Sequence, residues 1–409
     1  MVLALTLTAC SRGVPAGGPG ADPVARTYAR LAVALGERDT DSIDYYYGPA
    51  DWVSDIRGNP PKLEEIARLA RELRQTLRPR LDARTDRLRR QLEAIAARAD
   101  ILIGASLAFD EESQALFGIR LPAALDTALL DLARAELARL LPGVAPLAQR
   151  VDAMERKFLV PPDRVPAVME RAMAGCREQT LAHVALPRGE NVALEYVHHK
   201  PWSAYSLYLG KLHSRIQINL DFALTIDRAL QLACHEGYPG HHVMHSLQDV
   251  SFVQQQKRLE WMVQPAFSPQ SWASEALASY AADMAFPGRS RLTFVRDQLL
   301  PLAGLAADGI EQFEAAERLL DHLQITQAAV AREFLDARLE WARASAALEK
   351  DAVMAHTDEA LKYISQFRTY VLCYTLGRER VRAAVGVEGD PWNRYRQLLT
   401  DPDAATALK

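Results

Sequence analysis

The sequence predicts a mostly helical protein with one small sheet, and three observations support this fold class. Apolar residues recur at intervals of three and four through much of the chain, for example over residues 63–77, which is the spacing of one buried helix face. Alanine and leucine dominate these stretches, and both are strong helix formers. Only residues 191–221 break this pattern, because they contain alternating and β-rich segments.

The same periodicity predicts the remaining helices. It covers residues 125–141, 165–182, 310–348 and 371–385. Within residues 191–221, three strand-like segments predict a small antiparallel sheet of two or three strands: 192–197, 203–208 and 215–220. A helix is expected to begin near Leu224, directly after this sheet. Seven of the ten histidines lie between His198 and His245, so chemistry is expected in this part of the chain.

Composition is that of a globular protein. The chain has 409 residues, of which 49% are hydrophobic and 24% charged. A net charge of −4 excludes the general basic surface that is typical of nucleic-acid binding. No linker rich in proline, glycine or serine divides the chain after residue 24, and no 18-residue apolar run is present. Residues 25–409 are therefore predicted to form one helical domain with two lobes around a deep cleft.

The N-terminus resembles a lipoprotein signal. An apolar stretch leads into Leu7-Thr8-Ala9-Cys10, which is similar to a bacterial lipobox, although the usual basic segment is missing. Residues 1–10 are interpreted as a signal remnant ending in the lipidated Cys10, and residues 11–24 as a flexible tether. This predicts a bacterial envelope protein held at the membrane by lipid, and the alternative is a chance cysteine in a frayed end.

Three further cysteines are widely spaced. Cys176, Cys234 and Cys373 are an odd number and form no disulfide framework, so they are interpreted as small buried residues. A single disulfide between two of them stays open.

The segment His235-Glu236-Gly237-Tyr238-Pro239-Gly240-His241-His242 predicts a metal site. A catalytic zinc ion takes three protein ligands, and a neighbouring carboxylate must accept the proton of a water molecule. The common His-Glu-x-x-His motif needs a histidine four residues after the first, where this chain has a proline. In a regular helix, the position six residues on points ~120° away, and the position seven residues on lies ~10 Å along the axis.

A break in the helix would resolve this conflict. Pro239 cannot donate to the helix, and Gly240 permits unusual backbone angles, so the helix is predicted to bulge or break there. Such a break can bring His241 beside His235, which makes His241 the favoured second ligand. His242 remains the alternative.

This segment also resembles a known family. His235, Glu236, Pro239, Gly240 and His241 match the His-Glu-x-x-Pro-Gly-His signature of the bacterial domain-of-unknown-function 885 family. The resemblance implies a zinc metallopeptidase with a helical, zinc carboxypeptidase-like fold and one zinc ion. Residues 44–52 are similar to a Tyr-x-Gly-Pro segment of such proteins, and the alternative there is a Gly-Pro turn with packed aromatic residues.

Two later segments complete the resemblance. Residues 274–283 are similar to the family's Glu-Gly-x-Ala-x-Tyr segment, which implies that Glu275 is the third metal ligand. Tyr374 and Gly377 match a further segment of the family. In this segment, Arg368, Thr369 and Tyr370 replace the family's Pro, Gly and Gln. Tyr374 is expected to stabilise an oxyanion, and Arg368 to bind a substrate carboxylate.

The predicted function is a zinc-dependent hydrolase that cleaves peptide bonds with metal-activated water and Glu236 as general base. The strand predicted over residues 215–220 is expected to pair with an extended peptide substrate. The alternatives are a non-catalytic envelope lipoprotein that binds a metal or a partner, and a zinc amidase or esterase acting on a non-peptide substrate. The sequence leaves open the substrate, the exo- or endopeptidase mode and the oligomeric state.

Overall fold

The computed structural model describes residues 22–200, 203–386, 389–406 and 408. The predicted signal remnant with Cys10 and most of the predicted tether lie outside the described residues. Helix α1 (Pro23–Arg38) begins two residues before the predicted domain start at residue 25. Its first turn is capped by the Asp22 side chain, which accepts from the Val24 amide at 2.9 Å, and Pro23 occupies the first helical position.

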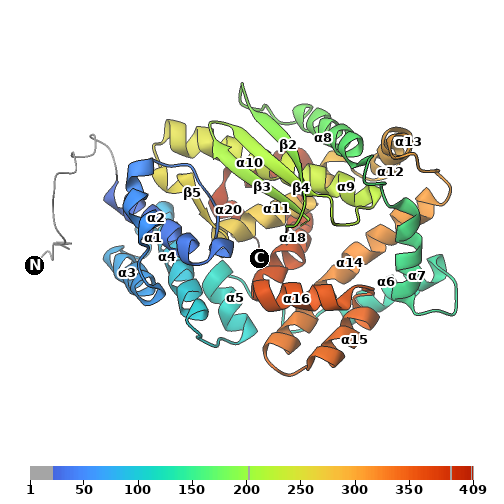
Figure 1. Cartoon of the computed structure of the whole chain (residues 1–409), viewed down its shortest axis with the longest axis horizontal. Helices are drawn as coiled ribbons and strands as arrows, with labels where there is room; N and C mark the ends of the chain where they lie inside the picture. Colours follow the sequence, from blue (N-terminus) through green and yellow to red (C-terminus); the bar gives the residue numbers. More distant parts are fainter. Residues whose placement is uncertain (1–21, 201–202, 387–388, 407, 409) are drawn as a thin grey trace, which may run out of the picture.

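The protein is mostly helical, as predicted (Figure 1). The α-helices after α1 are α2 (Ser54–Gly58), α3 (Leu63–Thr76), α4 (Ala83–Leu102), α5 (Phe109–Phe117), α6 (Thr127–Leu140), α7 (Leu147–Glu155), α8 (Val165–Leu181), α9 (Ile226–Leu232), α10 (His241–Gln248), α11 (Pro269–Ala285), α12 (Arg289–Phe294), α13 (Leu300–Ala303), α14 (Ile310–Leu335), α15 (Trp341–Asp351), α16 (Thr357–Phe367), α17 (Val371–Tyr374), α18 (Leu376–Val385), α19 (Pro391–Thr400) and α20 (Pro402–Thr406). Short 3-10 turns are η1 (Thr40–Ser42), η2 (Ala50–Trp52), η3 (Arg156–Phe158), η6 (Leu259–Met262) and η8 (Arg368–Tyr370), and π-helical turns are η4 (Ala233–Gly237), η5 (Asp249–Gln255) and η7 (Val295–Leu299).

A three-stranded sheet lies where the sequence predicts one, but it is mixed rather than antiparallel. Its strands are β2 (Asn191–Val197), β3 (Ala204–Gly210) and β4 (His213–Asn219), in the order β2-β4-β3. A two-residue turn with positive φ at Lys211 and Leu212 joins β3 and β4 as an antiparallel hairpin. Strand β2 pairs with the other edge of β4 and runs parallel to it.

This topology overturns one expectation about the substrate. The strand predicted over residues 215–220 corresponds to β4, and both edges of β4 are hydrogen-bonded within the sheet. A strand in this position cannot add a peptide. The outer strands of this sheet are β2 and β3.

A second sheet was not predicted. Strand β1 (Ile43–Tyr46) pairs antiparallel with β5 (Val263–Pro265), more than 200 residues later in the chain. These strands have only four and three residues, too few for a periodic pattern to be recognised. The pairing brings the N-terminal segment against the chain that leads into α11.

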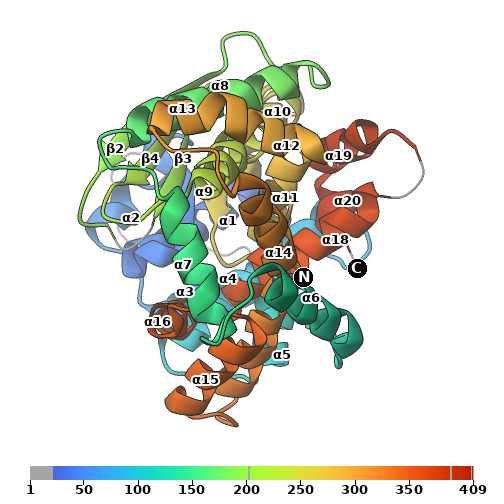
Figure 2. The same cartoon turned by 90° about the vertical axis from the view of Figure 1, so that its right-hand side faces the viewer.

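Helix α11 runs through the middle of the molecule in both views (Figure 1 and Figure 2). Ser268 caps its start by accepting from the Ser271 amide at 3.1 Å, and Pro269 is its first residue. Every residue from Pro269 to Ala278 is buried, as expected of a helix surrounded by other elements. A smaller hydrophobic core formed largely by α1, α3 and α4 lies at the N-terminal end, and the larger core surrounds α11. The deep cleft between two lobes stays a prediction.

Two of the cysteines form a disulfide, which corrects their interpretation as free buried residues. Cys176 of α8 is bonded to Cys234 of η4, with 5.4 Å between the Cα atoms. The spacing of 58 residues could not identify the pair, because it depends on α8 packing against η4. Cys373 is buried and free, as expected.

Within the described part of the chain, no helix has both the length and the apolar content that a membrane span requires.

Replacing both bonded cysteines by Cys176→Ala and Cys234→Ala should lower the free energy of unfolding by about 4 kcal/mol, because the cross-link spans 58 residues and restricts the unfolded chain. Denaturant unfolding of the oxidised wild type and the double variant measures this loss, with Cys373→Ala as the control that keeps the disulfide. If alkylation of the unfolded, unreduced protein modified Cys176 and Cys234, the cross-link would be disproved.

Candidate metal centre

The helix that carries His235 breaks where the sequence predicts it to. Helix α9 continues into the π-helical turn η4, which ends at Gly237, and α10 begins at His241. Between them Tyr238 is extended, and the Tyr238–Pro239 peptide bond is cis. Such π-helical turns are frequent at functional sites.

Gly240 brings the chain back onto the end of η4. Its amide donates to the Cys234 carbonyl at 3.0 Å. A Cβ atom at this position would lie 1.9 Å from the His235 carbonyl oxygen, so only glycine fits here. This return places the ring centroids of His235 and His241 4.7 Å apart. Two histidines with the wrong spacing for a regular helix thereby become neighbours.

Glu275 of α11 contacts both imidazoles. Its Oε2 lies 3.2 Å from His235 Nε2, and its Oε1 lies 3.5 Å from His241 Nε2. Two ligands of one tetrahedrally bound zinc ion, each at 2.0–2.1 Å from it, lie about 3.3 Å apart. The three side chains therefore have the spacing that a shared metal ion requires. Glu275 Oε2 is also buried without a hydrogen bond of normal geometry, so it can accept a metal ion.

The choice between His241 and His242 follows from their hydrogen bonds. His241 Nδ1 lies 2.9 Å from Ser274 Oγ, which leaves its Nε2 directed at Glu275. Both ring nitrogens of His242 are occupied elsewhere, one by Ser214 Oγ at 2.8 Å and the other by Glu190 at 2.9 Å. His242 therefore supports the surrounding structure, and His241 is the candidate ligand.

Glu236 lies beside the same histidines. A carboxylate oxygen of Glu236 and one ring nitrogen each of His235 and His241 all lie within 4.8 Å of one another. Distance alone therefore does not separate the metal ligand from the base. Glu275 contacts both imidazoles and is held by a further hydrogen bond, whereas the 6% exposed Glu236 makes no hydrogen bond with the described residues. Glu275 is therefore the candidate ligand, and Glu236 is the candidate group for moving a proton.

Electrostatics link Glu275 and His241. Burial opposes charge on both groups, but the two side chains stabilise each other's charged form. The pKa of His241 is raised to about 9, and the pKa of Glu275 is well below its usual range. A metal ion that binds here must displace the His241 proton. Burial beside His241 and His242 lowers the pKa of His245 well below its usual value, so His245 is neutral.

Two residues that position the site were missed by the sequence reasoning. Tyr370 donates to Glu275 Oε1 at 3.1 Å and lies 3.1 Å from Ser271 Oγ. Ser274 orients His241 as described above. In the sequence, Tyr370 is one of the residues that replace the family's Pro, Gly and Gln, and Ser274 directly precedes Glu275, so neither carries a signal of its own. Their roles depend on how α11 packs against the C-terminal helices.

The other two predicted site residues differ in placement. The ring of Tyr374 lies 6.2 Å from that of His235, measured between centroids, so it reaches the site. Arg368 donates through Nε to the buried Glu112 at 2.6 Å, and Glu112 also accepts from the Thr369 hydroxyl at 2.9 Å. Among the described residues, the ion pair of Arg368 is with Glu112 and not with a residue of the candidate metal centre, and its role as a carboxylate-binding group stays a prediction.

A third missed residue is Asp44, in the segment that is similar to the family's Tyr-x-Gly-Pro segment or, in the alternative, forms a Gly-Pro turn with packed aromatic residues. Its carboxylate accepts from Gln264 Nε2 at 2.9 Å. Burial, opposed by this hydrogen bond and supported by the nearby Glu275, raises the pKa of Asp44 to about 7. Asp44 is therefore electrostatically linked to the metal centre.

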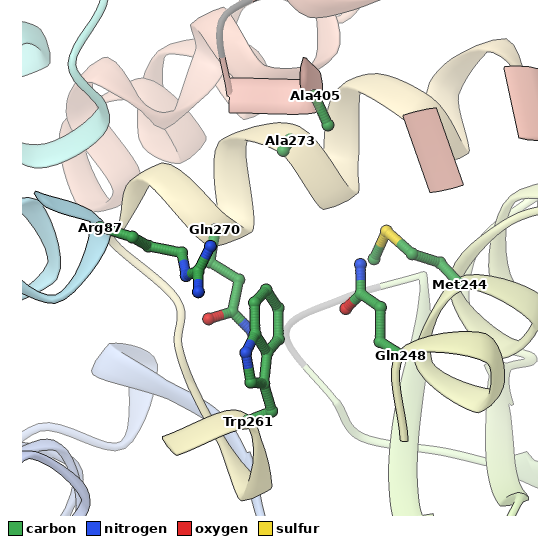
Figure 3. Close-up of a pocket in the computed structure, with 7 residues that line it drawn as sticks. All are labelled: Arg87, Met244, Gln248, Trp261, Gln270, Ala273 and Ala405. Atoms are coloured by element: carbon green, nitrogen blue, oxygen red, sulfur yellow. The ribbon is translucent and has the colours of Figure 1, made fainter. Parts of the chain in front are cut away.

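Figure 3 shows a small cavity lined in part by residues of α10 and α11. Arg87, Gln248, Trp261 and Gln270 line it together with apolar side chains, and its volume of about 10 Å³ has room for one water molecule. Arg87 Nη2 and Trp261 Nε1 have no hydrogen-bond partner in the structure, which such a water could supply. A second cavity of about 220 Å³ lies at the end of β4 and the start of α9. Neither is lined by a candidate metal ligand.

Glu190 should stabilise the fold in a pH-dependent way. Burial alone would raise its pKa, but hydrogen bonds from His242, Tyr238 and Arg177 outweigh burial and lower the pKa to about 2. Because an unfolded glutamate titrates near ~4.3, this stabilisation is present above about pH 4.5 and is lost as the pH falls toward 2. Glu190→Gln should therefore lower the free energy of unfolding by about 1–3 kcal/mol at pH 7, and by progressively less below pH 4.5.

Denaturant unfolding at several pH values between 3 and 7 measures this difference. Glu178→Gln on α8 is the matched control, because that carboxylate is 61% exposed and should contribute little at any pH. A loss of stability in Glu190→Gln that was the same at pH 3 and pH 7 would contradict the assignment.

No family model and no curated protein matches this sequence. Among solved structures, the chain is similar to the crystal structure of "the putative lipoprotein from Colwellia psychrerythraea", with a TM-score of 0.50 and 13% sequence identity. The similarity covers 93% of this chain and 73% of that chain. At this identity it shows a shared, mostly helical fold. The resemblance to the domain-of-unknown-function 885 family stays a prediction.

Proposed function

We propose that the protein binds one zinc ion through His235, His241 and Glu275 and hydrolyses amide bonds, with peptides as the substrate class. The observation that supports this most is the spacing of 3.2 and 3.5 Å between Glu275 and the two imidazoles, with Glu236 beside them and not hydrogen-bonded to any described residue. Two imidazoles and one carboxylate are a typical ligand set of catalytic zinc, which leaves a position for water. Structural zinc sites more often use four protein ligands.

The bound ion would lower the pKa of water toward ~7 and polarise a carbonyl group. Glu236 takes the proton of the attacking water and then delivers it to the leaving nitrogen. Tyr374 donates a hydrogen bond to the developing oxyanion. Burial raises the pKa of the Tyr374 hydroxyl well above its usual value, so the hydroxyl keeps its proton at neutral pH.

The substrate is expected to lie along β3. Since β4 is central, only β2 and β3 present an outer edge among the described strands of this sheet. The hydroxyl of Tyr205 in β3 donates to the Asp44 backbone carbonyl at 2.5 Å, which links β3 to the segment beside the metal centre. An extended peptide could add to this edge through main-chain hydrogen bonds, while its side chains remain available for selection.

We further propose that the protein acts in the bacterial envelope, anchored by lipid on Cys10. The Cys176–Cys234 disulfide supports an oxidising compartment. The lipobox-like sequence before Cys10 and the description of the Colwellia protein as a lipoprotein agree with this location.

A second candidate function is a non-catalytic envelope lipoprotein that binds a metal or a partner. The similarity to the Colwellia protein favours this candidate more directly than hydrolysis, because its description mentions a lipoprotein and no activity. Glu236, which makes no hydrogen bond with the described residues, favours hydrolysis, because a non-catalytic metal site has no use for a base beside its ligands. A zinc amidase or esterase acting on a non-peptide substrate would use the same residues.

Glu275→Ala should weaken zinc binding by more than about 100-fold, because loss of a direct ligand exceeds the 10–100-fold effect of losing an outer partner. Metal analysis after dialysis and titration against a chelator measure this change. Glu236→Gln is the control and should retain one equivalent of zinc. Equal zinc affinity in wild type and Glu275→Ala would exclude Glu275 as a ligand.

Glu236→Gln should reduce the turnover of a mixed-peptide digest by about 10²–10⁴-fold while zinc content stays the same, because the group that moves the proton is lost. Mass spectrometry of the digest measures the cleavage products. Full activity in Glu236→Gln would exclude this residue as the base. Zinc-loaded wild type that cleaved no peptide, amide or ester would support the non-catalytic candidate instead.

A further inference from the structure

Asp44 occupies an irregularity in the small sheet of β1 and β5. Ile43 pairs with Pro265 and Tyr45 with Gln264, so β1 has one residue more than β5 at this point. The extra residue is Asp44. A bulge of this kind turns a side chain away from the regular direction of the strand and is common beside active sites.

The surroundings of Asp44 hold it in one orientation. Its Oδ2 accepts from Gln264 Nε2, and Gln264 is itself held through its Oε1 by Gln270 Nε2 at 3.3 Å and the Tyr45 hydroxyl at 3.4 Å. The backbone carbonyl of Asp44 accepts from Tyr205. Asp44 is a half-buried residue, and no described residue donates a hydrogen bond to Oδ1 or places a lysine or arginine against the carboxylate.

The charge of the site is unbalanced. The ring of Tyr45, the residue after Asp44, lies 5.0 Å from that of His245, and the His245 ring stacks on that of His241 at 5.7 Å, measured between centroids, so Asp44 lies close to the metal centre. When Asp44, Glu236 and Glu275 are all ionised, a divalent ion leaves one negative charge uncompensated. A further positive charge is therefore favoured beside Asp44, and the described part of the protein supplies none.

We propose that Asp44 binds a primary ammonium group of the substrate and so selects amides with a charged amino group close to the bond that is cleaved. This inference rests on the proposed function of the metal centre and adds a substrate class to it. An ammonium group has three donors and can use the open Oδ1. A guanidinium group would prefer both oxygens of one carboxylate, and Gln264 already occupies Oδ2.

Two other roles for Asp44 are less well supported. It does not orient His241, because the ring nitrogens of His241 face Ser274 and Glu275. It does not belong to a second metal site among the described residues, since the one group of ligand atoms within 4.8 Å of each other comprises His235, Glu236 and His241.

The test uses zinc-loaded Glu236→Gln protein, so that binding is measured without cleavage. Calorimetry compares tetra-alanine carrying a free amino terminus with its N-acetylated form. The free form should bind about 10- to 100-fold more tightly, which is the gain in affinity expected from a hydrogen bond to a charged group. Adding Asp44→Asn should bring the ratio of the two dissociation constants, acetylated form to free form, close to one. Adding Asp51→Asn, an exposed carboxylate of the same N-terminal segment, should leave the ratio unchanged.

A second pair of peptides identifies the source of the ammonium group. Both are N-acetylated, and their first residue is lysine or norleucine; tighter binding of the lysine peptide would assign the site to a side chain rather than to the amino terminus.

Three results would overturn the inference. The first is a ratio of dissociation constants near one in Glu236→Gln, the second is a ratio that Asp44→Asn does not change, and the third is no measurable binding of any peptide. Hydrolysis by the wild type is assayed separately on the same peptides. A wild type that shows the binding ratio but no cleavage would refute the proposed hydrolase and leave the ammonium site standing.

Discussion

The return of the backbone at Gly240 onto the end of η4 is the constraint on which the candidate metal centre depends. The Gly240 amide caps the Cys234 carbonyl, and no side chain fits between Gly240 and His235. This contact brings His241 beside His235 without the usual helical spacing. It also starts α10 at an angle that directs His242 toward Ser214 of β4, so the same turn ties the centre to the sheet.

Helix α11 supplies the other half of the centre, and its burial explains why Glu275 can be held so firmly. A carboxylate in the interior is costly unless it is paired, and here two imidazoles and Tyr370 compensate for it. Gly377 of α18 packs directly against Ala276, since a Cβ atom at Gly377 would lie 2.8 Å from the Cβ of Ala276. This close approach of two helices sets Tyr370 and Tyr374 against the site.

Sequence reasoning succeeded where the signal is local. Helical periodicity predicted the fold class, and Pro239-Gly240 predicted the break, because both depend on neighbouring residues. It failed where partners lie far apart: the β1–β5 pairing, the Cys176–Cys234 disulfide and the contacts of Asp44. The mixed sheet was missed for a related reason, since alternation predicts strands but not the order in which they pair. Glu275 was predicted as a ligand through a family resemblance rather than through spacing, and its contacts with both imidazoles are compatible with that prediction.

Cys234 is the residue directly before His235, so the cross-link to α8 is attached one position away from the candidate metal ligand. A recombinant chain made in a reducing cytoplasm would keep both thiols free, and only packing would then hold α8 against this turn. A chain exported before purification would carry the bond. The choice of expression host therefore decides which of two chemically different proteins is being studied.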